Sequence, residues 1–179
     1  QHWGNPLYRW DVASAEGYRN LCRLVTQMKM RAAKGEGALA LHEFEGFTTG
    51  LIALAGRSIL NVHQHGLGGL LDRLVGLFGQ GNVYVELQRP YERGDTRRHA
   101  TLRDLAEHLG VETVATGNVH AHTPRRALLQ DALVAIRCRT SLDGCERDRR
   151  GNREAVLRAP AEMVERFAGI DRTAAERTV

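Results

Sequence analysis

Asn118, His120 and His122 occupy alternate positions and form the group of side chains best suited to binding a metal ion. They follow residues 111–115, an apolar run that predicts a β-strand, and they precede the pair Thr123–Pro124. That pair predicts a helix start, with the threonine side chain as the cap and the proline at the first helical position. Because ligands of parallel α/β proteins bind at the carboxyl ends of strands, chemistry is expected in this segment.

His120 is the stronger candidate ligand, since it follows a strand end and imidazole binds transition metals well. The amide oxygen of Asn118 can bind a hard cation, although less strongly than a carboxylate. Each residue also has a purely structural interpretation. His120 could be a hydrogen-bonded histidine at the rim of the sheet, Asn118 could cap a turn, and His122 could be an exposed loop residue. The sequence therefore predicts a metal site at Asn118 and His120 that is short of the three or more ligands of a closed site.

Other polar residues give weaker evidence of a metal-binding or catalytic site. His63 and His65 have ligand-like spacing but lie in a glycine-rich loop. Glu86 is expected to line the core or to form a buried salt bridge with Arg89, and Asp131 to be solvated or ion-paired. The sequence contains no Gly-x-Ser-x-Gly motif, plausible Cys–His pair, Walker loop or dinucleotide fingerprint, so we assign no catalytic residue.

The elements that must position these residues alternate between strands and helices. A continuous apolar run predicts a strand at 50–55, and largely apolar runs predict further strands at 83–87 and 111–115. Helical spacing predicts helices that begin after Ser14, near Leu67, at Asp95 or Thr96, at Pro124 and near Pro160. The helix after Pro124 has one apolar face, made of Leu128, Leu129, Ala132, Leu133 and Ile136.

This order of elements predicts a parallel α/β sheet or part of a barrel. Three strand–helix units would leave two sheet edges open, which is typical of a slice of a larger architecture. Uncovered apolar faces are therefore expected to lower stability or to cause self-association.

Composition bounds the class of protein. The chain has 179 residues, of which 42% are hydrophobic and 26% charged, as in an ordinary soluble domain. Three widely spaced cysteines fit a reduced cytoplasmic protein, and neither a signal peptide nor a membrane span is predicted. The net charge is +4, and the basic residues, including the run 147–153, are nearly all arginine. They fit either a solvated surface or contacts with a nucleic-acid backbone.

Several segments in order carry a resemblance to a known family. They are EGYRNLCRLV (16–25), GLIALAG (50–56), VYVELQRPYERGD (83–95), VATGNVHAHTPRRALLQDALVAIR (114–137) and ERDRRGNREAVLRAPAEMVERF (146–167). Over residues 15–167 the chain resembles the bacterial DNA polymerase III alpha-subunit family, most closely its error-prone branch. In that family these segments form the later part of the PHP (polymerase and histidinol phosphatase) domain and the lead-in to the polymerase palm.

The resemblance implies a partial, distorted βα barrel of the PHP type with a short helical C-terminal lead-in. It divides the chain into an unmatched segment 1–13, a partial PHP domain 14–140, and a connector with the start of the polymerase region 141–179. In the family, strand ends hold divalent metals (Mg, Mn or Zn), and some members have 3′–5′ exonuclease or phosphoesterase activity. The family's early metal motifs and polymerase aspartates lie outside this sequence, so the chain is expected to be truncated at both ends.

Departures from the family pattern predict a weak or lost metal site. The late Asp-x-His motif is Asn118-Val119-His120 here, and Arg57 occupies a position where many relatives have cysteine. We therefore expect a degenerate PHP scaffold from a cytoplasmic error-prone polymerase that acts on DNA in replication and repair synthesis, together with replication or repair proteins. The fragment alone is expected to be inactive. Two alternatives stay open: a metal-dependent phosphoesterase using His120, and an inert or DNA-contacting module.

Overall fold

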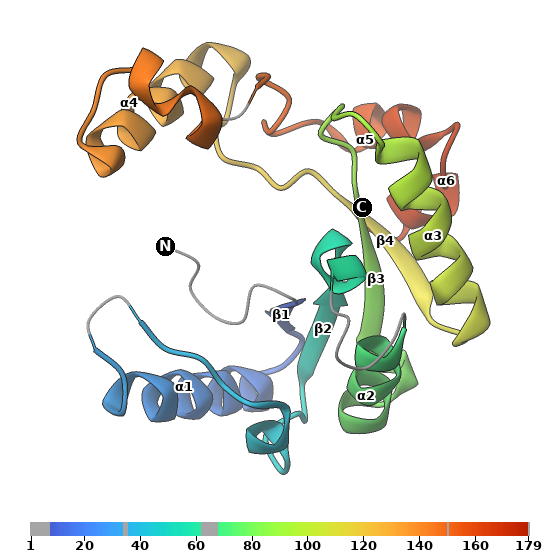
Figure 1. Cartoon of the computed structure of the whole chain (residues 1–179). Coiled ribbons are helices and arrows are strands. Elements are labelled where there is room, and N and C mark those ends of the chain that lie inside the picture. Colours follow the sequence, from blue (N-terminus) through green and yellow to red (C-terminus); the bar gives the residue numbers. More distant parts are fainter. Residues whose placement is uncertain (1–7, 34–35, 62–67, 150, 179) are drawn as a thin grey trace. The chain divides into compact units, whose positions relative to one another are not determined.

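A computed structural model describes residues 8–33, 36–61, 68–149 and 151–178. Its sheet has four strands in the order β1-β2-β3-β4 (Figure 1). These strands are β1 (Tyr8–Val12), β2 (Leu51–Ala55), β3 (Val83–Gln88) and β4 (Glu112–Thr116). Strand β1 is antiparallel to β2, and β2 is parallel to β3. The predicted α/β class is confirmed, whereas the barrel stays a prediction.

The chain divides into two compact units. The first unit consists of Gln1–Leu87 and Arg98–Val114, and the second consists of Gln88–Arg97 and Ala115–Val179. The sequence segment with the candidate ligands therefore belongs to the second unit. Among the residues that the structure describes, no helix is both long and apolar enough to cross a membrane.

The predicted helices α1 (Ala15–Met30), α2 (Gly69–Phe78) and α3 (Asp95–His108) are all present. The Ser14 hydroxyl accepts a hydrogen bond of 3.0 Å from the Gly17 amide, so the predicted cap of α1 is confirmed. Helix α2 ends at Gly79, whose φ of 82° favours glycine. Helix α3 already includes Asp95, and its carboxylate accepts a hydrogen bond from the amide of Glu92.

The core of the first unit lies where these helices pack on the sheet. Fully buried side chains come from both kinds of element, as the apolar spacing predicts: Leu24, Leu51, Ala53, Leu71, Leu74 and Val85. The Phe44 ring lies 5.3 Å from that of Trp10 and 5.7 Å from that of Phe78, measured between ring centroids. Burial of these groups is the main stabilising contribution to this unit.

Strand β1 corrects two expectations. Residues 1–13 have no periodicity, yet Tyr8–Val12 forms an edge strand along β2. Glu86 is 3% exposed, which confirms that it lines the core, but its carboxylate pairs with the Arg9 guanidinium and not with Arg89. Glu86 and Arg9 come from strands on either side of β2, and such a pairing across the sheet leaves no local spacing signal.

The second unit contains α4 (Ala127–Cys138), α5 (Pro160–Phe167) and α6 (Arg172–Glu176). A 3₁₀ turn, η4 (Pro124–Arg126), precedes α4, and another, η5 (Asp143–Asp148), follows it. Thr123 and Pro124 occupy the predicted cap and first helical positions, but the Thr123 side chain makes no capping hydrogen bond. That part of the prediction is wrong.

Helix α4 packs through the side opposite to its apolar face. Val134 and Ala135 are buried with Cys145 of η5 in one small cluster. The large residues of the apolar face are exposed, by 55% for Leu128, 53% for Leu129, 53% for Leu133 and 72% for Ile136. An apolar stripe at helical spacing predicts a buried face, and here the described structure leaves it uncovered.

Candidate functional site

The segment that follows β4 is held by backbone hydrogen bonds to a second, parallel segment. The amides of His120 and Ala121 donate to the Ala155 carbonyl over 2.9 and 3.2 Å, and the Leu157 amide donates to the Ala121 carbonyl over 3.2 Å. Ala121 and Val156 form a parallel β-bridge. The region in which the sequence predicts ligands is therefore fixed by contacts along its backbone.

Asn118 begins this segment in a left-handed backbone conformation, with a φ of 43°. Asparagine tolerates this conformation better than most residues, because its short side chain can hydrogen-bond locally. Asn118 lines a small hollow with Gln88, Asn152 and Glu154. Arg89 also lines it, so the hollow contains amide groups, one carboxylate and one guanidinium.

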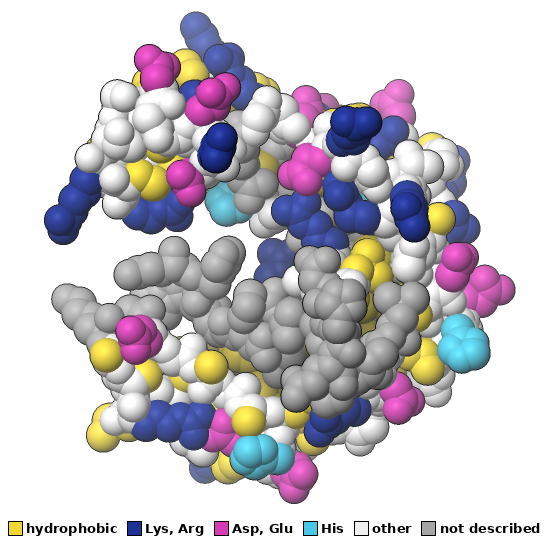
Figure 2. Space-filling model, in the orientation of Figure 1, with side chains coloured by type: hydrophobic (Ala, Val, Ile, Leu, Met, Phe, Trp, Pro, Cys, Tyr) yellow, Lys and Arg dark blue, Asp and Glu magenta, His cyan; other side chains and the backbone are white. Residues whose placement is uncertain are grey.

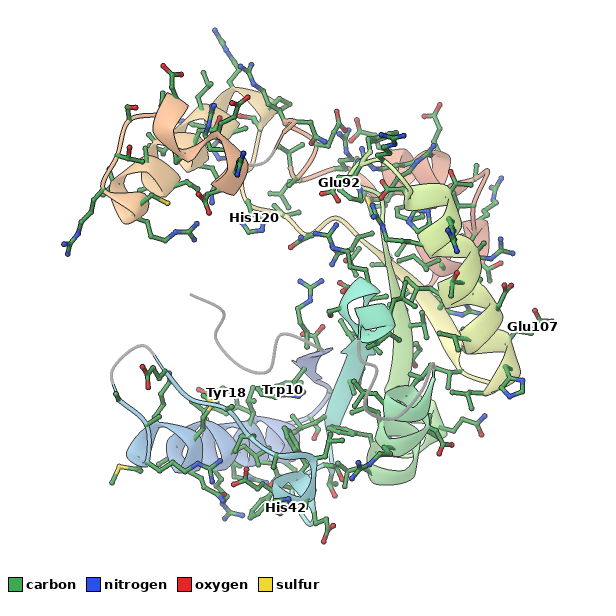
Figure 3. The ribbon with its side chains drawn as sticks, in the orientation of Figure 1. Trp10, Tyr18, His42, Glu92, Glu107 and His120 are labelled. Carbon is green, nitrogen blue, oxygen red and sulfur yellow. The ribbon has the colours of Figure 1, made fainter. Side chains whose placement is uncertain are left out.

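His120 is exposed and lies on the segment between β4 and α4, where Figure 3 labels it. It lines one hollow with Asp131 and Asn152, and a second hollow with His122 and Leu129. The structure therefore brings His120 near His122 and near Asp131.

Asn118 and His120 line different hollows, so the two predicted ligands do not converge on one of them. Within the described ranges, no three side chains of His, Cys, Asp or Glu are grouped closely enough to hold a metal ion. His63 and His65 lie outside the described residues. The donors described here do not form a closed site for the divalent metal that the family resemblance implies.

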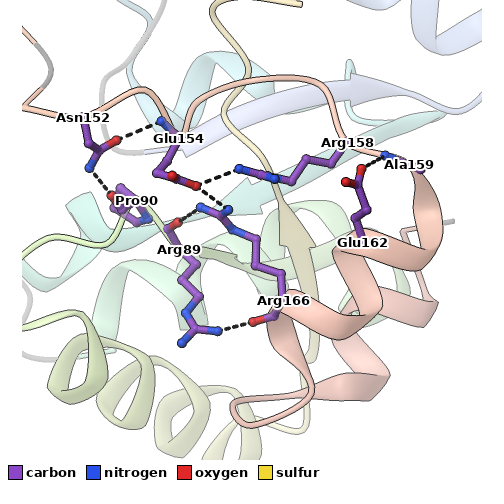
Figure 4. Close-up of polar contacts among 8 residues, drawn as sticks. All are labelled: Arg89, Pro90, Asn152, Glu154, Arg158, Ala159, Glu162 and Arg166. Atoms are coloured by element: carbon purple, nitrogen blue, oxygen red, sulfur yellow. Dashed lines mark hydrogen bonds and ion pairs between the residues drawn. The ribbon is translucent and has the colours of Figure 1, made fainter. Parts of the chain in front are cut away.

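An ion-paired cluster lies beside the hollow that contains Asn118 (Figure 4). Glu154 Oε2 accepts hydrogen bonds from Arg158 over 2.7 Å and from Arg166 over 2.8 Å. The hydrogen bond from Arg166 is the main cause that lowers the pKa of the Glu154 carboxyl, and the positive charges of Arg166 and Arg158 add to it. Glu154 is therefore ionised at neutral pH and joins the parallel segment to α5.

Arg166 also joins α5 to Arg89, the residue that follows β3. Arg166 donates to the Arg89 carbonyl, and Arg89 donates in return to the Arg166 carbonyl. Both guanidiniums lie over the Tyr91 ring, at 4.8 Å for Arg89 and 4.4 Å for Arg166. Such cation–π contacts strengthen when they are partly shielded from water.

Asn152 completes this cluster. Its side-chain amide donates to the Pro90 carbonyl over 2.6 Å, and its carbonyl oxygen accepts from the Glu154 amide over 3.0 Å. Sequence reasoning missed the roles of Asn152, Glu154 and Arg166. Glu154 and Arg158 are four residues apart, but neither lies in a helix, so this spacing is not a helical signal that could have identified the pair.

The net positive charge of the chain is concentrated in the second unit. Its sequence contains fifteen Lys and Arg residues against eleven Asp and Glu, whereas the first unit contains ten of each kind. Long-range electrostatic attraction of anionic partners would therefore act mainly on the second unit.

Comparison with known proteins finds matches along most of the chain, although no family model matches it. An error-prone DNA polymerase from Rhodopseudomonas palustris (strain BisB5) is 37% identical over 151 residues, which cover 84% of this chain and 13% of that protein. One from Pseudomonas savastanoi pv. phaseolicola is 38% identical over 135 residues, covering 73% of this chain and 12% of that protein. Error-prone DNA polymerase 3 from Agrobacterium fabrum is 34% identical over 163 residues, which cover 90% of this chain and 14% of that protein. The chain thus spans only about an eighth of the length of these relatives.

Proposed function

Because the chain is related in sequence to one segment of the error-prone DNA polymerases, we propose that it is a scaffold segment of such a polymerase. The complete protein would carry out DNA-directed DNA synthesis in replication and repair in the cytoplasm. In this proposal residues 14–140 are a degenerate PHP domain of partial barrel form. Residues 141–179 lead into the polymerase region.

The backbone contacts of the segment after β4 carry the scaffold proposal. His120 and Ala121 are bound to the Ala155 carbonyl through their amides. The neighbouring carboxylate, Glu154, is engaged by Arg158 and Arg166. A carboxylate that already neutralises two guanidiniums is a poor metal ligand, because binding a cation would require breaking those pairs. The charged groups here support a structural role.

DNA is the substrate expected for the complete polymerase, and the charge of the second unit supports DNA contact by this segment. Backbone contacts made by arginine release counterions, so such binding would weaken steeply as salt is added. Replication or repair proteins belong to the proposal as partners of the complete polymerase. Phosphoryl transfer would rely on metal-bound carboxylates of the complete protein.

The experiment that tests the proposal measures phosphodiester hydrolysis by the purified chain with Mn²⁺ or Zn²⁺. The scaffold proposal predicts equal background rates for the chain, His120→Ala, and the control variant His108→Ala. His108 is an exposed histidine at the end of α3, in the other unit. Metal-dependent hydrolysis that is lost in His120→Ala and retained in His108→Ala would contradict the scaffold proposal and support the phosphoesterase alternative. The pairing of His120 with His122 in one hollow is the observation on which that alternative depends.

A further inference from the structure

Two hollows adjoin His120, and their linings suit an anion better than a cation. Both are lined by His120, Ala121 and Gln130, so they lie next to one another, and we call them the His120 hollows. Arg153 lines one of them and Arg126 lines the other. A guanidinium is no metal ligand, because it has no lone pair to offer, and its charge repels a divalent cation. The lining residues therefore do not fit the metal that the family resemblance implies at this strand end.

Arg126 and Arg153 keep their charges available to a ligand. Both are exposed, and within the described ranges neither guanidinium has a hydrogen-bond or ion-pair partner. Asp131 is the one carboxylate among the described residues that line the His120 hollows, and its Oδ2 lies 3.9 Å from Arg149 Nη1. The lining therefore keeps an excess of positive charge.

The hollows also contain neutral donors and enough space for a phosphate group. His122 and Gln130 line the larger hollow together with Arg126, and its volume is about 230 Å³. One water molecule occupies ~30 Å³ in the liquid, so this hollow admits a phosphate group with several waters. Guanidinium N–H groups match the spacing of phosphate oxygens, and amide and imidazole N–H groups donate to the same oxygens. In Figure 2, Lys and Arg side chains lie over the part of the chain that Figure 1 labels α4.

We infer that the His120 hollows bind phosphate groups of a DNA strand directly, without a metal ion. Arg126 and Arg153 would each contact a phosphate, with His122 and Gln130 as further donors. The phosphate chemistry follows from the lining residues, whereas the choice of DNA rests on the proposed function, because the relatives of this chain are error-prone DNA polymerases. No bond forms or breaks in this contact, so it is compatible with a scaffold role.

An acidic stretch from the rest of the complete polypeptide is a poorer occupant. The hollows lie between the end of β4 at Thr116 and the start of α4, and ligands of α/β proteins bind at such strand ends. Guanidiniums on both sides of His120 also match a strand that carries one charge on every nucleotide.

The test measures binding of a short fluorescein-labelled oligothymidylate to the full chain by fluorescence anisotropy, with and without EDTA. The inference predicts that EDTA leaves binding unchanged. Arg126→Gln and Arg153→Gln should each weaken it about threefold, and the combined change about tenfold. Arg125→Gln and Arg147→Gln are matched controls, because these arginines are also exposed but do not line the His120 hollows, and they should change binding less than twofold. All four side chains are exposed, so the variants are expected to keep the unfolding midpoint of the chain.

The salt dependence of binding is a second readout. For single-stranded DNA, each phosphate contact changes the slope of log K against log salt concentration by about 0.7. The combined change Arg126→Gln and Arg153→Gln should therefore make the slope shallower by about 1.4. The combined change Arg126→Lys and Arg153→Lys keeps both charges and should keep the slope.

The inference is overturned if the oligonucleotide does not bind, or if binding requires Mn²⁺. Equal weakening by the Arg126 and Arg125 variants would also overturn it, since it would show diffuse attraction and leave only the general DNA contact of the proposed function. An oligoglutamate peptide that displaces the probe as well as unlabelled oligothymidylate does would identify carboxylates as the ligands, such as the rest of the polypeptide could supply. Displacement by inorganic phosphate, but not by chloride of equal ionic strength, would identify free phosphate and overturn the assignment to DNA.

These results are separate from the test of the scaffold proposal. Metal-dependent hydrolysis of a phosphodiester contradicts the scaffold proposal, whereas loss of the phosphate contact alone leaves it in place.

Discussion

Arg166 donates a hydrogen bond from Nη1 to Glu154 Oε2 over 2.8 Å, and this contact joins helix α5 to the segment that supports the strand end. The two residues are twelve positions apart. The backbone next to Glu154, at Ala155, accepts the hydrogen bonds of His120 and Ala121. The Glu154–Arg166 pair therefore helps to fix the segment in which the sequence predicts ligands.

Glu154→Gln removes the negative charge and is expected to lower the free energy of unfolding by about 1 kcal/mol, because the pair is partly exposed and screened by water. Urea unfolding measures this change. Glu165→Gln, a substitution at an exposed position of α5, is the control and should have no measurable effect. Equal stability of the two variants would show that the ion pairs of Glu154 contribute nothing.

The contribution of Glu154 depends on pH with a definite sign. The pKa of this carboxyl is lowered from its ordinary value of 4.5, mainly by the hydrogen bond from Arg166. Its stabilisation is therefore complete above the ordinary pKa and is lost as the pH falls through the lowered value. The difference in unfolding free energy between the chain and Glu154→Gln should be constant near neutral pH and should vanish in acid. A difference that grows on acidification would contradict this assignment.

Arg166→Ala should cost more stability than Arg158→Ala. The Arg166 side chain is 10% exposed and contacts Glu154, the Arg89 carbonyl and the Tyr91 ring, whereas that of Arg158 is 23% exposed and pairs with Glu154. We expect about 2 kcal/mol for Arg166→Ala and less than about 1 kcal/mol for Arg158→Ala, both measured by urea unfolding. The reverse order would show that the contacts of Arg166 to the Arg89 carbonyl and the Tyr91 ring are not stabilising.

Gly17 and Gly50 require the absence of a side chain where α1 meets the start of β2. A β-carbon on Gly17 would lie 1.8 Å from the Gly50 carbonyl oxygen, and Gly50 has a φ of 73°. Gly17→Ala should therefore lower the free energy of unfolding by about 3 kcal/mol, because the backbone must move. Gly76→Ala is the matched control. It lies in α2 with nothing within 4 Å of its added β-carbon, so it should raise stability by about 0.5 kcal/mol.

Glu43 should titrate far below an ordinary glutamate. A hydrogen bond from Arg31, followed by one from the Ala40 amide, lowers the pKa of its carboxyl to about 2. Carboxyl carbon chemical shifts followed by NMR during an acid titration would report this pKa directly. In Arg31→Ala the pKa should rise toward 4.5, while Lys29→Ala, whose ammonium contacts the Glu36 carbonyl, should leave it unchanged. An unchanged pKa in Arg31→Ala would contradict the assigned cause.

Local chemistry made much of the fold predictable. Ser14 begins α1 and Gly79 ends α2, because a hydroxyl cap and a left-handed glycine act within a few residues. Strand β1 was not predicted, since its pairing with β2 depends on residues far apart in the chain. The Arg9–Glu86 pair was missed for the same reason.

The candidate site was predictable in part. The strand end at Thr116 and the helix start at Pro124 place Asn118 and His120 where expected. They line different hollows, and neither the φ of Asn118 nor the hydrogen bonds to Ala155 leaves a pattern in the sequence. The exposure of the apolar residues of α4 was also not predictable, because spacing identifies an apolar face without identifying what covers it.

Thermal unfolding of the chain and of His120→Ala, each with and without Mn²⁺ or Zn²⁺, tests the scaffold account most directly. A bound metal at a hundred times its dissociation constant would add about 2.7 kcal/mol of stability and visibly raise the midpoint. The scaffold account predicts that the metal leaves the unfolding midpoint of each protein unchanged. A midpoint that rises with metal in the chain, and no longer rises in His120→Ala, would contradict it and establish a metal site at His120.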